Sequence, residues 1–198
     1  MSSETIDQLV GRAQQGDTGA VEALYQRYAQ SVYRYIYYRV SSTIDAEDLT
    51  AEVFVKMVEG LPRYRITGAP FEAWLYRIAA ARVIDHRRRT KRRPQAELTE
   101  NLADSATQPE EEVQRAQEIE MLRRAFSQFN DEEQTLLILR FVERKSHQEV
   151  ADVLGKSPAA VKSMQHRTLL RLASLLGSEE KVRHYLRGGN HDRISPRP

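Results

Sequence analysis

Apolar residues along this chain recur at spacings of three and four, the period of a helix with one buried face. The clearest stretch covers about residues 18–40, and its stripe also contains the charged Arg39. The other members of that stripe are Val21, Leu24, Tyr25, Tyr28, Val32, Tyr35 and Ile36. Alternating, strand-like runs are nearly absent. The pattern therefore predicts an all-α protein.

Four helices are expected in the first half of the chain, over about residues 4–15, 18–40, 45–59 and 70–93. Asp45 is expected to cap the third helix, and Pro70 suits the first position of the fourth. The third helix should turn five apolar residues inward: Leu49, Val53, Phe54, Met57 and Val58.

An abrupt change of charge marks a domain boundary. The fourth expected helix ends in a basic run from Arg82 to Arg93, and residues 94–112 are acidic and poor in apolar side chains. Such a composition is typical of a flexible, solvated linker. Two small helical domains are thus expected, at 1–93 and 113–177, followed by a disordered tail at 178–198.

Residues 146–176 carry the most specific local pattern. Ser146 and Glu149 form a capping box, Gly155 permits a tight turn, and Ser157 followed by Pro158 starts a second helix. A short helix, a glycine turn and a longer helix match the DNA-binding helix-turn-helix.

The second helix of this motif sorts into two faces. Val161, Gln165, Thr168 and Leu172 should face the core. The expected DNA contacts are Ser157, Lys162, Ser163, His166 and Arg167, and Lys156 and Arg171 also suit phosphates. A solvated helical hairpin is the alternative, but the acid-free face favours DNA.

Carboxylates gather on the third expected helix, where Asp48 and Glu52 lie four residues apart on one face. Paired carboxylates can hold magnesium. No histidine or third inward carboxylate accompanies them, so a protein-binding surface is favoured over a metal site, and plain solvation remains an alternative. The fourth helix ends in basic residues, which suit single-stranded DNA when aromatic rings are near. Tyr64, in the loop 61–69 before that helix, is the best candidate for contacting a base, whereas Trp74 fits the core.

Composition removes several functional classes. The 198 residues include no cysteine, 40% are hydrophobic, 29% are charged, and the formal net charge is +2. No apolar run is long enough to span a bilayer, and the N-terminus lacks the pattern of a signal peptide. A cytoplasmic protein without membrane insertion is expected. No glycine-rich phosphate loop or nucleophile motif is present, so neither an enzyme nor a cofactor is expected.

In order along the chain, these motifs resemble the extracytoplasmic-function (ECF) sigma factors over about residues 5–176. The segments that carry the resemblance are Asp45–Phe54 (DAEDLTAEVF), Phe71–Ala79 (FEAWLYRIA), Val83–Arg88 (VIDHRR), Val161–Ser163 (VKS) and the pair His166-Arg167.

The resemblance implies roles for both domains. The first would be sigma region two, whose Asp45, Asp48 and Glu52 bind the beta-prime clamp helices of core RNA polymerase. Its contacts to the melted minus-ten strand would be Tyr64, Arg65, Arg77, Arg82, His86 and Arg89. The second would be sigma region four, which reads duplex DNA at the minus-35 element and meets the polymerase beta flap. An anti-sigma factor is a further partner that the family suggests.

In the second domain two residues depart from the family pattern, because Met164 and Leu169 stand where basic residues are common, and in the first domain Ala51 replaces a frequent glutamine. Two rival functions also stay open. A stand-alone helix-turn-helix regulator would explain residues 146–172 alone. A metal-dependent nuclease or phosphotransferase would use Asp45, Asp48 and Glu52, but lacks a histidine cluster.

Overall fold

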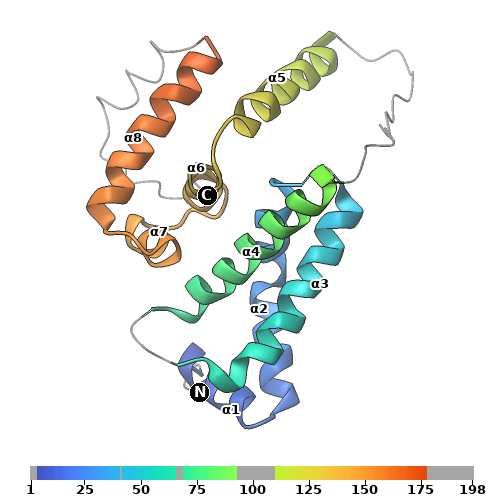
Figure 1. Ribbon diagram of the computed structural model, residues 1–198, viewed down its shortest axis with the longest axis vertical. Helices are drawn as coiled ribbons and strands as arrows, with labels where there is room; N and C mark the ends of the chain where they lie inside the picture. Colours follow the sequence, from blue (N-terminus) through green and yellow to red (C-terminus); the bar gives the residue numbers. More distant parts are fainter. Residues whose placement is uncertain (1–3, 41, 66–68, 93–109, 178–198) are drawn as a thin grey trace.

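The structure is a computed structural model that describes residues 4–40, 42–65, 69–92 and 110–177. Helices account for every regular element in these ranges, as the sequence predicts. They form two groups that lie against each other (Figure 1).

The first domain consists of four α-helices and one short 3₁₀ turn. Its elements are α1 (Ile6–Gln14), α2 (Thr18–Tyr37), α3 (Thr43–Gly60), the 3₁₀ turn η1 (Leu61–Arg63) and α4 (Phe71–Arg92). Helix α2 packs against α1, α3 and α4, so its stripe forms the centre of this domain. Arg39, which follows α2, is only 4% exposed, as its place in the apolar stripe suggested.

The second domain contains α5 (Glu110–Ser127), α6 (Asp131–Leu137), the π-helical turn η2 (Ile138–Val142), α7 (His147–Leu154) and α8 (Pro158–Leu175). Helix α5 begins within the range 94–112 that was expected to be linker. The rest of that range and the expected disordered tail lie outside the described residues.

Two expectations for α3 were wrong. Its cap is Ser42, whose hydroxyl accepts a hydrogen bond from the backbone N–H of Asp45, so Asp45 lies inside the first turn. Both residue types cap helices well, so the residue type alone does not choose between them. Val58 is 46% exposed, because the inward stripe of α3 is completed by Leu49, Val53 and Met57.

The buried core is continuous across the two domains. Apolar residues of α2 and α4 belong to the same cluster as Leu136, Leu139 and Val150 of the second domain. Helices α6 and α7 lie nearest the first domain, and α8 lies on the outer side (Figure 1). Among the described helices, none combines the length and the apolar character needed to cross a membrane.

Candidate nucleic-acid interface

The helix-turn-helix forms as the local sequence predicts. The Ser146 hydroxyl accepts from the Glu149 N–H at 3.2 Å, and the Glu149 carboxylate accepts from the Ser146 N–H at 2.7 Å. Partial burial raises the pKa of the Glu149 carboxyl, but the hydrogen bonds from Ser146 and the nearby Lys145 together outweigh it, so the pKa is lowered. Gly155 then takes a left-handed φ of 65°, and Ser157 caps α8 with Pro158 in its first turn.

Helix α8 presents a polar face to solvent. Val161, Gln165 and Thr168 are buried as expected. The Gln165 side-chain oxygen accepts from Arg140 Nε at 2.9 Å, which fixes the inner face. The five expected contacts for the minus-35 element are all exposed, in agreement with the two-face assignment: Ser157, Lys162, Ser163, His166 and Arg167.

The two departures from the family pattern in the second domain lie on the inner side of α8. Leu169 is 8% exposed and packs with Phe129 and Leu137, and Met164 is half-buried against the main core. Neither side chain therefore belongs to the face that the exposed polar residues define.

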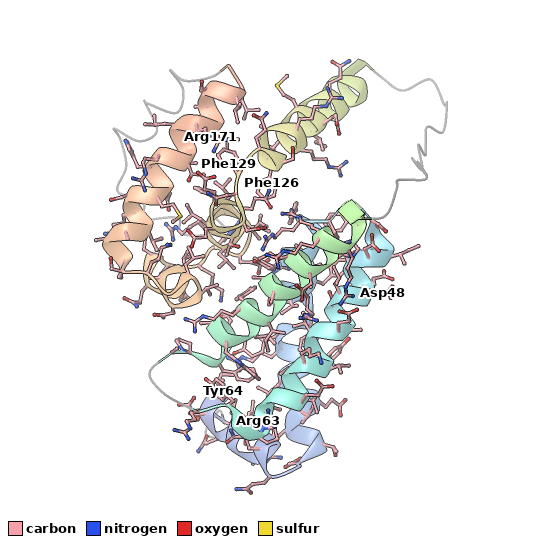
Figure 2. All side chains as sticks on the ribbon, in the orientation of Figure 1. Asp48, Arg63, Tyr64, Phe126, Phe129 and Arg171 are labelled. Carbon is pink, nitrogen blue, oxygen red and sulfur yellow. The ribbon has the colours of Figure 1, made fainter. Side chains whose placement is uncertain are left out.

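Two cations expected to suit phosphates are already engaged. Arg171 donates to the Gln128 carbonyl at 2.9 Å, lies 3.4 Å from a Glu133 oxygen, and covers the Phe129 ring at 5.0 Å (Figure 2). Lys156 lies 3.2 Å from a Glu132 oxygen. Arg171 therefore connects α8 to the junction of α5 and α6, and is not a free phosphate ligand.

The residues of α4 that are expected to bind the melted minus-ten strand differ in how far other groups of the protein already engage them. Arg89 is exposed. Arg82 pairs with Asp85 at 2.7 Å, and His86 lies 3.5 Å from Asp45. Arg77 donates to the carbonyl oxygens of Asp152 and Val153 at the end of α7. The structure thus distributes these side chains along α4 and does not gather them into one pocket.

Tyr64 lies beside η1 at the opposite end of the domain from the start of α3 (Figure 2). Its half-buried ring packs on Trp74 at 4.7 Å and on Phe71 at 5.5 Å. Partial burial raises the pKa of Tyr64, and its hydroxyl donates to the Ala69 carbonyl at 3.3 Å. Trp74 fits closely against Gly60, where an added Cβ would lie 2.8 Å from the indole.

Arginine side chains flank Tyr64 on the chain. Arg65, an expected contact, is exposed. Arg63 in η1 is exposed as well (Figure 2), although the sequence analysis did not single it out. Basic residues on both sides of an aromatic ring are the sequence signal that could have identified Arg63.

Asp48 and Glu52 are both exposed, and Figure 2 shows Asp48 on the side of α3 that faces away from α6–α8. Three exposed apolar residues of α3 surround them, namely Ile44, Val55 and Val58. Exposed apolar side chains that lie beside polar ones suit a protein partner. Within the described residues, no group of three or more histidine or carboxylate side chains is placed to hold a metal ion.

Family models match both domains. The model of Sigma-70 region 2 matches residues 24–93, and the model of Sigma-70, region 4 matches residues 119–172. Together the two models match more than half of the chain. Their order along the chain is the same as that of the two sets of motifs.

Individual relatives agree with this result. The chain is 36% identical over 181 residues to the ECF RNA polymerase sigma factor BldN of Streptomyces coelicolor, covering 90% of this chain and 69% of that protein. It is 33% identical to the RNA polymerase sigma factor YlaC of Bacillus subtilis, covering 77% of this chain and 90% of that protein.

Solved structures support the same fold. CnrH, in complex with the cytosolic domain of CnrY, aligns with a TM-score of 0.63 at 21% identity, over 86% of this chain and 96% of that chain. The sigma factor RpoE of Bartonella quintana, in complex with the anti-sigma factor NepR, aligns with a TM-score of 0.57 at 16% identity, over 79% and 96%.

Proposed function

The chain belongs to the ECF sigma factors of RNA polymerase, which are not enzymes, and from that premise we propose how its two domains divide promoter recognition. Sigma factors of this family direct transcription initiation. The observation that carries the division is the exposed, acid-free face of α8, on a helix-turn-helix whose caps and turn are all formed.

The second domain, residues 113–177, reads the minus-35 element. Lys162, Ser163 and His166 lie where α8 would enter the major groove, and base edges there present distinct donors and acceptors. Ser157 and Arg167 lie beside them and suit the phosphates, which fix the register of the helix on the duplex.

The first domain, residues 1–93, captures the melted minus-ten strand. Arg65 and the ring of Tyr64 mark one end of this surface, and Arg77, Arg82, His86 and Arg89 continue it along α4. Base extrusion costs a few kcal/mol, which contacts to the base and its phosphates must offset. Arg63 is an addition to this set.

Core RNA polymerase is the proposed partner of α3. Asp45, Asp48 and Glu52 would face the beta-prime clamp helices, and the apolar residues Ile44 and Val55 would be covered with them. The second domain would meet the beta flap. An anti-sigma protein is a further proposed partner, for which Ile119, Met121 and Leu122 of α5 offer exposed apolar surface.

A footprint on promoter DNA with and without core polymerase tests this assignment. We expect specific protection of both elements only when polymerase is present, and loss of polymerase binding when Asp48 and Glu52 are changed to lysine. Glu22→Lys, at an exposed acid of α2, is the matched control and should bind normally. Tight specific binding by the chain alone would instead favour a stand-alone regulator.

A further inference from the structure

The last residue of α1 binds the turn that precedes the proposed minus-ten contacts. Gln14 Nε2 donates hydrogen bonds to the Leu61 carbonyl at 2.9 Å and to the Tyr64 carbonyl at 2.7 Å. The Gln14 side chain is half-buried where α1 packs against η1, at one end of the first domain (Figure 1). One side chain thus connects α1 to residues that lie 47 and 50 positions further along the chain.

The two acceptors explain why an amide suits this position. A carbonyl oxygen only accepts hydrogen bonds, whereas the nitrogen of a side-chain amide carries two N–H groups, one for each carbonyl. A methionine at position 14 has a similar length and flexibility, so it would keep the packing between α1 and η1 and lose both donors. The hydrogen bonds of Gln14 can therefore be removed without adding a charge or a large cavity.

The turn η1 has little else to fix its backbone. It is a single 3₁₀ turn without a side-chain cap, and 3₁₀ hydrogen bonds have poorer geometry than those of an α-helix. The N–H of Tyr64 donates to the carbonyls of Gly60 and Leu61, at 3.0 and 3.1 Å. Because Gln14 binds the carbonyls of Leu61 and Tyr64, it holds the turn at its first residue and just after its last.

Separate contacts fix the side chain of Tyr64. Its hydroxyl donates to the Ala69 carbonyl at 3.3 Å, and its ring packs on Phe71 and Trp74, whose own rings lie 5.4 Å apart. The N–H, the carbonyl and the hydroxyl of Tyr64 are thus all engaged within the first domain. The backbone at this residue is set relative to α1 by Gln14, and its ring is set relative to α4.

We propose that Gln14 is a positioning residue for minus-ten recognition, because it fixes the backbone that carries Arg63, Tyr64 and Arg65. This inference rests on the proposed function of the first domain. Arg63 and Arg65 are exposed on either side of the half-buried Tyr64, and Figure 2 shows Arg63 beside it. A shift of this backbone would move both cations and the ring together relative to the melted strand.

A fixed backbone matters here because base capture must offset the cost of extruding the base. A turn that fluctuates has to be ordered during capture, and the free energy of ordering is subtracted from that of binding. The effect should be confined to the minus-ten step. The proposed polymerase surface near the start of α3 lies at the opposite end of the domain, and the proposed minus-35 face belongs to α8.

Promoter opening by the full chain with core polymerase tests the proposal. The probe is a promoter fragment with 2-aminopurine at each minus-ten position in turn, because its fluorescence rises when the base leaves the stack. We expect Gln14→Met to slow this rise about tenfold, through the loss of two hydrogen bonds. Gln15→Met, the same change at the exposed neighbouring position, is the matched control and should open the promoter at the wild-type rate.

Base discrimination separates positioning from a general loss of folded protein. The opening rate is measured on the preferred minus-ten base and on a substituted base, and the ratio of the two rates is compared between proteins. A smaller folded fraction would lower both rates equally and leave the ratio unchanged. A misplaced turn should lower the ratio, because contacts to the preferred base weaken most.

A second variant covers the case in which Gln14→Met does not bind core polymerase. Gln14→Asn keeps the amide but is one methylene shorter, so it would reach at most one of the two carbonyls. It should lower the ratio in the same direction and by less.

A ratio equal to that of the wild type in both variants would overturn the positioning role, as would an equal loss of rate on the two bases. An effect of Gln15→Met as large as that of Gln14→Met would also overturn it. A wild-type chain that opens promoters without discriminating any minus-ten base would instead reject the proposed function of the first domain.

Discussion

Arg34 and Glu143 are 109 positions apart in the sequence, yet they form a two-pronged ion pair with very unequal access to water. The Arg34 side chain is 40% exposed, whereas that of Glu143 is 4% exposed. Removal of Glu143 would leave a cation that water can still reach. Removal of Arg34 would leave a shielded carboxylate without its charged partner.

This inequality predicts that Arg34→Met lowers the free energy of unfolding more than Glu143→Gln does. An uncompensated buried charge costs about 3–5 kcal/mol, and movement of the Glu143 loop towards water would reduce that cost. The free energies of unfolding of both variants, measured with denaturant at low salt, should rank in that order. Equal values would mean that the exposure difference has no energetic consequence.

Glycine at position 155 should be needed for its backbone conformation. A side chain in the left-handed region costs roughly 1–2 kcal/mol, so Gly155→Ala should lower the free energy of unfolding by about that amount. Nothing lies within 4 Å of the added Cβ, so the loss of stability would come from the backbone conformation alone. Gly11→Ala, within α1 and equally unhindered, should stabilise the chain by roughly 0.5–1 kcal/mol. Thermal unfolding of both variants checks the opposite signs.

Local features of this fold could be predicted because their determinants are adjacent in sequence. The Ser146 capping box, the Gly155 turn and the Ser157 cap each depend on residues within four positions of one another. The α3 cap was missed because Ser42 and Asp45 are both suitable, and hydrophobic spacing does not choose between them.

The interdomain contacts could not be predicted in this way. Arg39 was visible as a charge within an apolar stripe, but its partner Asp131 lies 92 positions away. Charge alone likewise marked Arg171 as a phosphate ligand, although Glu133 and the Phe129 ring hold it. Which cations remain available is decided by tertiary contacts rather than by composition.

Buried tyrosine hydroxyls should make the first domain sensitive to alkali. Burial, with the Glu72 charge, raises the pKa of Tyr28 to about 12 from an unfolded value near 10. The unfolded chain therefore ionises first, so the stabilisation is complete below pH 10 and is lost as pH rises from about 10 to 12. Tyr28→Phe should remove part of that loss, on the order of 2 kcal/mol. Denaturant unfolding at stepped pH measures it, and an equal slope in both proteins would contradict the assignment.

Lys162 and Arg171 lie on the same helix but should fail in different ways when replaced. Arg171→Ala loses the Gln128 hydrogen bond and the Phe129 contact, so it should lower stability by about 1–2 kcal/mol. Lys162 is exposed, and Lys162→Ala should leave thermal unfolding unchanged while reducing transcription from promoters that depend on the minus-35 element. His166→Ala in addition should deepen that defect. A template without a minus-35 element is the control: if Lys162→Ala impairs it equally, α8 is not reading that element.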